Sequence, residues 1–560
     1  MHDLVIKGAT VVDGTGSAGY VADVAVVGGR IAAVGADVGP GKEAIDAAGL
    51  TLTPGIIDPH THYDAQITWD PSASPSLELG VTTVLMGNCG FTIAPCRPDD
   101  RELTLKNLTQ VEGMSLDALL TGTHWEFETF PEYLDMLESR GVGPNVATYC
   151  GHSSLRTWVM GAEASTRAAE EEEVAEMKRL LLEALDAGAA GFATSTFEGH
   201  NGWGGTPMPS RLADRREIET LVGALGEAGR GCFMLTKGRN DDVAFFEQLA
   251  RESGRPILVA AVVYDDANPD GAGNDIAGIE AAAERGHPVY AQVPCTPISM
   301  DLKLTGFYAF EGMQAWKPAI GLYEKPERLT ELYSDSAFRS AVKEELVAPG
   351  ALNRFTDQWD LMEILEVSKP QHEHLVHRTV GELAREEGKH PLDWMLDFGI
   401  AEDFETTFNA QILNSNEDEV LKLLKSERTS ITLSDAGAHL SLFCDAGFAL
   451  HMLSRWVRER GDFSLEEAVH RLTGAQAEIY GLKDRGTIAP GQAADLFLFD
   501  AAHVGRAPKQ RVSDLPAQAS RLVTGAVGVE GVWVNGIRVV DDSGLVLGEA
   551  RPGHVLREFG

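Results

Sequence analysis

Cysteine is scarce in this chain of 560 residues: six are scattered along it, and no two share a CxxC spacing. That scarcity excludes a disulfide-stapled fold and a CxxC metal cluster. Long apolar runs are also missing, and because a transmembrane helix needs about 18–20 such residues, we expect no membrane span. The opening segment MHDLVIKGATVVDG alternates like a strand and lacks a basic, apolar leader. We therefore expect no secretory signal peptide and a cytoplasmic protein.

Basic residues are few as well, since 47 Lys and Arg stand against 84 Asp and Glu, for a formal net charge of −37. A surface this acidic repels polyanions, which argues against nucleic acid or an anionic membrane as a partner. Hydrophobic residues make up 44% of the chain and charged residues 23%, so a substantial core is available and disorder is excluded. We expect a globular protein that acts on a small molecule. The sequence leaves a homo-oligomer open.

Strand-like segments occur at both ends of the chain and alternate with helices in between. The ends, 1–54 and 481–545, predict one small β-sandwich domain built from both termini. Helical periodicity appears at 165–187, 216–229 and 241–253. Eight apolar strands alternating with helices predict an α/β fold with a (β/α)8 TIM-like barrel over 55–480. The strand segments are LTPGIIDPH, VTTVLMGN, NVATYCGH, AAGFATSTF, CFMLTKGR, PILVAAVVY, HPVYAQV and SITLSDAG.

The stretch around 300–400 breaks this alternation and predicts an insertion. Its aromatic segment FYAFEGMQAW (307–316) either caps a pocket or packs on the barrel. His372, His374 and His377 have a metal-like spacing. They lie in a charged, helix-like stretch, so we interpret them as a solvated face.

Two histidines one residue apart, His60 and His62, end the apolar segment TPGIIDPHTHYD. On a strand, residues i and i+2 point the same way, so both imidazoles can ligate one metal ion. An isolated HxH is more often a pair of surface histidines in a turn. Here the pair ends the first predicted barrel strand, with Asp58 and Asp64 on either side, and this context favours a metal site.

Asp435, in SITLSDAGAHLSLFCDAG, directly follows the last predicted barrel strand. Loops after the strands build the active sites of this fold, so its carboxylate can bind a metal ion and accept a proton from water. The alternative is a helix N-cap, because Ser434 and Asp435 precede a turn rich in Gly and Ala. Combined with the HxH pair, the acid favours the catalytic role.

The sequence resembles the amidohydrolase superfamily, specifically its D-aminoacylase-like (N-acyl-D-amino-acid deacylase) branch, over nearly the whole chain. The markers are VIKGATVVDGTG, GRIAAVG, TPGIIDPHTHYD, GVTTVLMGNCG, SDAGAH, DRGTIAPGQAADLFLFD and VWVNGIRVV. The resemblance implies a barrel with a terminal β-sandwich, His60 and His62 as metal ligands, and Asp435 as a ligand that also shuttles the proton. It implies Cys89 as a zinc ligand, a role that suits a thiolate, although a buried apolar cysteine is the alternative.

The chain departs from the family pattern after its fifth and sixth strands. Relatives carry a metal-binding histidine where this chain has Lys237, and another where it offers Tyr264 near the strand end. A protonated amine cannot ligate a metal ion, whereas a carboxylated lysine can bridge two. Lys237 is therefore a carboxylated ligand, a cation for the substrate carboxylate or a structural ion pair, and the zinc count is one or two.

Together with Tyr264, four further residues are candidates for substrate binding. Arg239 matches a family arginine whose guanidinium suits an α-carboxylate, with a surface arginine as the alternative. His152 resembles a family histidine near the substrate, or it orients loops. His439, four residues after Asp435, is a candidate for contact with the leaving group or the oxyanion. His200 lies in a Gly-rich loop and is a weaker candidate for lining the pocket.

The leading functional prediction is a metal-dependent amidohydrolase that cleaves the amide C–N bond of an N-acyl D-amino acid. The altered ligand set leaves another amide, a cyclic amide, a carbamate or an ester open. A lyase such as a decarboxylase is a second class that the scaffold hosts. A non-catalytic binding protein is the third, and the retention of His60, His62 and Asp435 argues against it.

Overall fold

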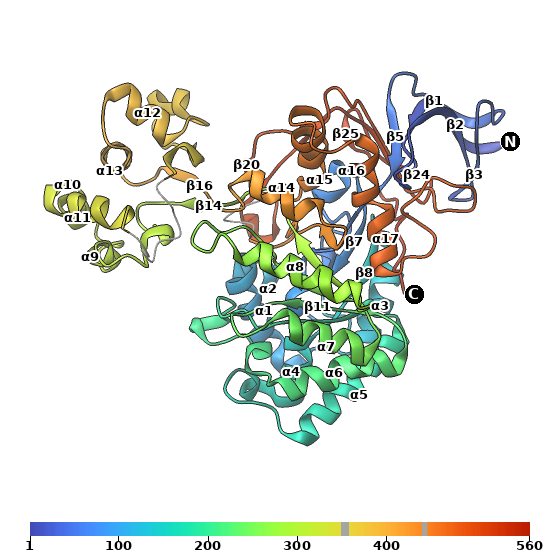
Figure 1. The fold of residues 1–560 in the computed structure, drawn as a ribbon, viewed down its shortest axis with the longest axis horizontal. Coiled ribbons are helices and arrows are strands. Elements are labelled where there is room, and N and C mark those ends of the chain that lie inside the picture. The colour runs from blue at the N-terminus through green and yellow to red at the C-terminus, as the bar shows by residue number, and fades with distance from the viewer. Residues whose placement is uncertain (349–357, 440–444) are drawn as a thin grey trace. The chain divides into compact units, whose positions relative to one another are not determined.

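The computed structural model describes residues 1–348, 358–439 and 445–560 (Figure 1). The chain forms two compact units. The first comprises Met1–Val262, Asn274–Thr296 and Leu423–Gly560, and the second comprises Val263–Gly273 and Pro297–Lys422. Most of the stretch predicted as an insertion therefore belongs to the second unit.

Within the described residues, the first unit has a parallel strand at each of the eight predicted strand segments. They follow one another in space in chain order. Thr61, just after the first strand, bridges Ala436 after the last in parallel, so the ends of the series meet. This confirms the predicted barrel. The strands are β6 (Ile56–Asp58), β7 (Val81–Met86), β8 and β9 (Asn145–Thr148 and Cys150–Gly151), β10 (Gly191–Ser195), β11 (Cys232–Thr236), β12 (Ile257–Ala260), β13 (Val289–Val293) and β17 (Thr429–Ile431).

The barrel strands are buried almost throughout because helices cover their outer faces. Helix α5 begins at a capping box between Glu170 and Glu173, and Gly188 ends it with a left-handed φ of 110°. Its apolar residues Val174 and Met177 are buried, as their spacing predicts. The helices of the first unit are α1 (Arg101–Glu112), α2 (Leu116–Gly122), α3 (Phe130–Arg140), α4 (His152–Met160), α5 (Glu171–Ala187), α6 (Arg215–Ala228), α7 (Val243–Ser253), α15 (Phe448–His451), α16 (Leu465–Leu472) and α17 (Gly474–Tyr480), with α8 (Gly271–Glu284) and α14 (Glu417–Lys425) at its borders.

Strands from both chain ends form one further sheet, in the order β25-β24-β23-β18-β5-β1-β2-β3, with β4 paired to β1 (Figure 1). Leu498 of β18 lies opposite Leu52 of β5, so the two ends of the sequence share one apolar core. This confirms the predicted β domain of both termini. Its strands are β1 (His2–Val11), β2 (Tyr20–Val27), β3 (Arg30–Gly35), β4 (Gly41–Asp46), β5 (Thr51–Pro54), β18 (Leu496–Phe499), β23 (Val529–Val534), β24 (Ile537–Asp541) and β25 (Gly544–Leu545); two short pairs add β19 (Gly505–Arg506) with β22 (Ala526–Val527) and β20 (Gln510–Val512) with β21 (Arg521–Val523).

The second unit has a core of its own around the antiparallel sheet β14-β16-β15. Phe307, Phe310 and Trp316 are fully buried there, so the aromatic segment packs inside this unit. Within the described residues of the whole chain, no helix is both long and apolar enough to cross a bilayer. The elements of this unit are β14 (Ile298–Leu302), β15 (Met362–Glu366), β16 (Thr407–Leu413), α9 (Lys317–Ile320), α10 (Pro326–Ser334), α11 (Ser336–Leu346), α12 (Val380–Glu387) and α13 (Pro391–Ala401).

The three closely spaced histidines of the second unit, His372, His374 and His377, lie on a short 3-10 helix (Pro370–Leu375) and just after it. His372 bonds to Glu402, whereas His374 and His377 are exposed. The candidate metal-binding group that the described residues form does not include them.

Candidate metal centre

His60 and His62 follow β6 directly and are both buried. Between them, the backbone N–H of Thr61 donates to the carbonyl of Leu85, and its hydroxyl donates to the same oxygen. The side chain of Thr61 thus faces the neighbouring strand β7. Because side chains alternate along an extended chain, both imidazoles share the opposite side.

Cys89 is presented by a tight turn after β7 and has a left-handed φ of 56°. A Cβ atom on Gly87 would lie 2.8 Å from the carbonyl oxygen of Tyr149, so this turn requires glycine. The side-chain amide of Asn88 donates to the carbonyl oxygens of Pro59, Thr61 and Leu85. Asn88 therefore fixes the cysteine turn to the segment that carries the two histidines.

Asp435 lies after β17 with a left-handed φ of 46°, an unfavourable conformation for a residue other than glycine. The hydroxyl of the preceding Ser434 donates to the carbonyl of His60 and accepts from the N–H of Ala436. No helix begins at Asp435 within residues 435–439, so the carboxylate is not an N-cap there. The loop holds it beside the histidines.

Four donor atoms converge at this point: Nε2 of His60, Nε2 of His62, Sγ of Cys89 and Oδ1 of Asp435. Nε2 of His60 lies 3.2 Å from Oδ1 and 3.8 Å from Sγ, and Nε2 of His62 lies 3.7 Å from Oδ1. In a tetrahedral zinc site, bonds of about 2.0–2.3 Å place the ligand atoms about 3.3–3.8 Å apart. These three distances therefore fit the edges of a tetrahedral site, and the ligand atoms of His60, His62 and Cys89 lie within 4.8 Å of one another.

Each imidazole has a polar side chain close to its other nitrogen, through a hydrogen bond for His60 and an ion-pair contact for His62. Nδ1 of His60 lies 2.8 Å from Oε1 of Gln292, and the amide of Gln292 donates to the hydroxyl of Tyr480. Nδ1 of His62 lies 3.1 Å from Oε1 of Glu112. A metal-binding histidine usually donates its second ring N–H to such an acceptor. Each Nε2 is thereby left to face the other donors.

Electrostatics within the cluster favour anionic ligands. Burial alone would raise the pKa of the Cys89 thiol and of the Asp435 carboxyl. Hydrogen bonds from the imidazoles outweigh burial and hold both pKa values below the usual ones. Burial would also lower the pKa of His60 and His62, but the neighbouring anionic groups raise it. Thiolate and carboxylate are the forms in which these groups bind a cation.

Two further predicted residues lie within electrostatic reach of this cluster. His439 has its pKa lowered by burial, an effect that Asp435 opposes. His200 has its Nδ1 2.6 Å from the hydroxyl of Ser195, and its ring lies edge-on to Phe91. Burial, with His439 adding to it, lowers the pKa of His200 to about 3, so this imidazole is neutral at pH 7.

Lys237 is held by a helix of the outer layer. Thr236, the last residue of β11, has its hydroxyl 3.1 Å from Sγ of Cys89 and so faces the cluster. The next residue along an extended chain faces the other way. The amine of Lys237 forms an ion pair with Asp275 of α8. Of the three roles considered for this lysine, the pairing matches the structural one.

Three other predicted residues make their described contacts with groups outside the donor set. Both ring nitrogens of His152 are occupied, by Thr194 Oγ1 at 2.7 Å and by Glu217 Oε1 at 2.8 Å. The side chain of Arg239 is exposed, and its backbone N–H donates to Glu198. Tyr264 belongs to the second unit, where its backbone pairs with Asn414.

Three residues that support the predicted ligands were not predicted from the sequence: Glu112, Gln292 and Asn88. A glutamine inside the apolar strand segment HPVYAQV is a usable signal, because a buried strand residue with an amide needs a partner. Glu112 gives no comparable signal, since it is one of many acids on predicted helices. Only the fold brings it to His62.

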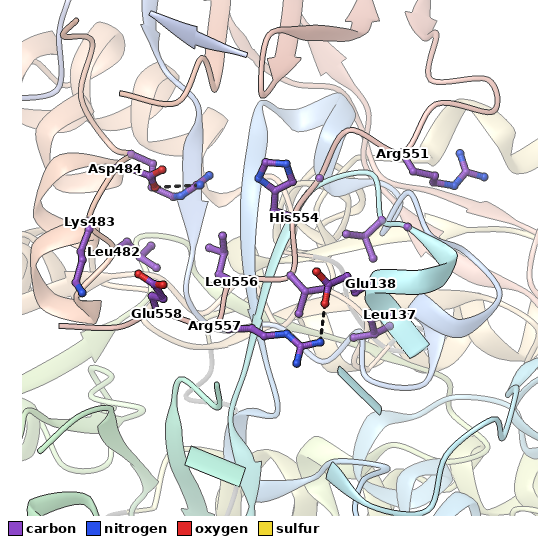
Figure 2. A pocket seen from close by; sticks show the side chains of 15 residues that line it. Leu137, Glu138, Leu482, Lys483, Asp484, Arg551, His554, Leu556, Arg557 and Glu558 are labelled. Atoms are coloured by element: carbon purple, nitrogen blue, oxygen red, sulfur yellow. Dashed lines mark hydrogen bonds and ion pairs between the residues drawn. The ribbon is translucent and has the colours of Figure 1, made fainter. Parts of the chain in front are cut away.

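A separate hollow of about 530 Å³ lies between the end of α3, residues 482–485 and the C-terminal segment 551–558 (Figure 2). It contains none of the predicted site residues. Four of its charged groups form ion pairs, Arg557 with Glu138 and Arg485 with Asp484. The hollow is therefore distinct from the metal-binding cluster and offers no comparable donor set.

Comparisons with known proteins show what the whole chain is similar to. The amidohydrolase family model matches residues 43–313 and 356–540. N-acyl-D-aspartate deacylase of Alcaligenes xylosoxydans xylosoxydans is 31% identical over 99% of this chain and 95% of that protein. Among solved structures, a D-aminoacylase that defines a novel subset of amidohydrolases matches with a TM-score of 0.66 at 26% identity, over 100% of both chains. N-acyl-D-glutamate deacylase from Bordetella bronchiseptica, complexed with zinc and a phosphonate inhibitor, matches with a TM-score of 0.65 at 26% identity, also over 100% of both chains.

Proposed function

We propose that this chain, which belongs to the amidohydrolase family, is a zinc-dependent deacylase of N-acyl-D-amino acids. As a member of the family it is a metal-dependent hydrolase of amide bonds other than peptide bonds. One observation carries the proposal: the ligand atoms of His60, His62 and Cys89 lie within 4.8 Å of one another, and the carboxylate of Asp435 contacts both imidazoles. The mixed nitrogen, sulfur and oxygen donor set is the reason for choosing zinc.

The proposed ligands are His60, His62, Cys89 and Asp435. We leave Lys237 out of this set because its amine pairs with Asp275. One ion is therefore proposed, and a carboxylated Lys237 that bridges two ions is the alternative. When bound, zinc supplies Lewis acidity that activates water and polarises the scissile carbonyl.

Asp435 is proposed to move the proton. Its carboxylate accepts a proton from the attacking water and returns it to the nitrogen of the leaving amine. Water is thereby added across the C–N bond, which gives a carboxylic acid and a free amino acid. His439 and His200 are proposed to line the substrate pocket, because both lie within electrostatic reach of the donor cluster.

The D-amino-acid preference rests on the relatives. The deacylases of N-acyl-D-aspartate and N-acyl-D-glutamate match this chain from end to end, so their substrate class is the one we propose here. The cytoplasmic location, the small-molecule substrate and a homo-oligomeric state stay predictions from the sequence.

A substrate panel tests the proposal. The zinc-loaded protein is offered N-acetyl-D-aspartate, N-acetyl-D-glutamate, neutral N-acetyl-D-amino acids and their L-enantiomers, and the released amine is quantified. We expect release from one or more D-substrates and little from the L-forms. Release from L-forms alone, or hydrolysis of esters with no turnover of any amide, would contradict the proposal.

A further inference from the structure

We propose that Glu112 is a positioning residue for His62: it orients the imidazole and strengthens its binding to the cation. The inference rests on the proposed zinc site. It concerns a carboxylate that touches the ligand and does not itself contact the cation.

The geometry places Glu112 behind His62. Glu112 is the last residue of α1, and the left-handed Gly113 (φ 57°) ends the helix immediately after it. The residue is 4% exposed, and Oε1 lies 3.1 Å from Nδ1 of His62. Both atoms are buried and neither makes a hydrogen bond within the described residues, so the 3.1 Å contact is one of ion-pair distance. The pair is therefore closed off from water and from competing contacts.

This position is unfavourable for a carboxylate unless a positive charge lies nearby. Burial in an apolar environment disfavours any ionised group that lacks a partner. The C-terminal end of a helix carries a partial negative charge, which adds to that cost. An imidazole that binds a cation through Nε2 presents a strongly polarised Nδ1–H to Glu112. Zinc binding and the placement of Glu112 thus stabilise each other.

The two histidine ligands differ in their partners. Nδ1 of His60 faces the neutral amide oxygen of Gln292, whereas Nδ1 of His62 faces a carboxylate. A carboxylate partner makes the imidazole a more basic ligand and fixes its tautomer more firmly. We infer that His62 is the stronger of the two donors and that Glu112 sets this difference.

The experiment compares wild type, Glu112→Gln and Glu112→Ala. Zinc affinity is measured by competition with a chelator, and the cobalt(II)-substituted proteins are compared by visible absorption. Loss of a carboxylate behind a metal-binding histidine costs about 10–100-fold in affinity. We expect a loss in this range for Glu112→Gln, a larger loss for Glu112→Ala, and a shifted cobalt band in both. Glu102→Gln is the matched control, because Glu102 lies on the same helix and pairs with Lys106 at the surface.

Wild-type zinc affinity and an unchanged cobalt spectrum in a folded Glu112→Gln protein would overturn the proposal. Far-UV circular dichroism of the metal-free proteins establishes folding. If neither variant folds, NMR of the histidine Nδ1–H protons in the zinc-loaded wild type decides: a His62 proton resonance further downfield than that of His60, whose partner is a neutral amide, supports the proposal, and one no further downfield rejects it. These readouts do not depend on turnover, so a chain whose zinc affinity depends on Glu112 but which cleaves no N-acyl-D-amino acid would fail the proposed function alone.

Discussion

At the residue scale, the chemistry is concentrated on Asp435, which combines an unfavourable backbone conformation with contacts to both histidines. Strained residues of this kind occur often at active sites, where the surrounding structure holds them in place. Ser434, bonded to the carbonyl of His60, is part of what holds this one.

Changing Asp435 to Asn tests its proton-transfer role. The amide has nearly the same shape but cannot accept the proton of water, so we expect kcat to fall by about 10²–10⁴-fold. Kinetics on the zinc-loaded variant, with its zinc content measured in parallel, separate lost proton transfer from lost metal. Asp542→Asn, an exposed aspartate of the first unit, is the control. Wild-type kcat in Asp435→Asn would place the proton shuttle on another group.

Lys237 provides a second residue-scale prediction. Because its amine pairs with Asp275, we expect the intact protein to carry no added CO2 by mass spectrometry. Lys237→Met should keep one zinc ion per chain, and bicarbonate should not alter activity. An added CO2 on this lysine, with zinc content halved in the variant, would instead support a bridging carboxylated ligand.

The sequence predicted the donors of the site better than their supports. His60, His62, Cys89 and Asp435 stand in recognisable segments, and the structure brings them together. Glu112 could not be predicted, because its pairing with His62 depends on where α1 ends in space. Side chains alternate along a strand, so once Thr236 is known to face Cys89, the side chain of Lys237 is expected to point away from the cluster.

At the element scale, a buried ionic network connects α4 to α6. Glu217 of α6 accepts from Arg156 of α4 at 2.6 Å and lies 2.8 Å from His152, and all three side chains are buried. Burial would raise the pKa of Glu217, but His152 and Arg156 hold it below its usual value. The network gives Nε2 of His152 a buried partner, and its predicted place near the substrate stays a prediction.

Glu217→Gln should lower the free energy of unfolding by about 3–5 kcal/mol at pH 7, because it leaves Arg156 buried without its counter-charge. The depressed pKa fixes the sign of the pH dependence. The stabilisation is fully present above the unfolded pKa of about 4.5 and is lost as pH falls through the lower folded pKa. Denaturant unfolding of both proteins from pH 7 to pH 3 should therefore show their difference shrinking in acid. A difference that grows toward low pH would contradict this account.

Element boundaries were predicted less well than the elements themselves. Periodicity predicted a helix over 165–187, whereas α5 begins at Glu171. The reason is the capping box between Glu170 and Glu173, which fixes the first turn of the helix. Before that turn, Arg167 forms ion pairs with Glu163 and Glu173. The strands were predicted more firmly because fully buried parallel strands leave long apolar runs in the sequence.

At the scale of the whole molecule, the fold class followed from the alternation of strands and helices and from the β-rich ends. The second unit was harder to delimit. It extends to Lys422, beyond the stretch of 300–400 that breaks the alternation, because β16 and its neighbours pair within that unit rather than with the barrel. Pairing between distant strands is a property of the folded chain that local patterns do not encode.

Zinc titration of the metal-stripped protein tests the central claim most directly. The stripped chain should release no amine from an N-acetyl-D-amino acid that the loaded enzyme cleaves. Activity should rise with added zinc and saturate at one ion per chain, because one set of donors converges in the described cluster. His60→Ala should weaken zinc binding and abolish activity together. Full hydrolysis by the stripped protein in the presence of a strong chelator would contradict the account.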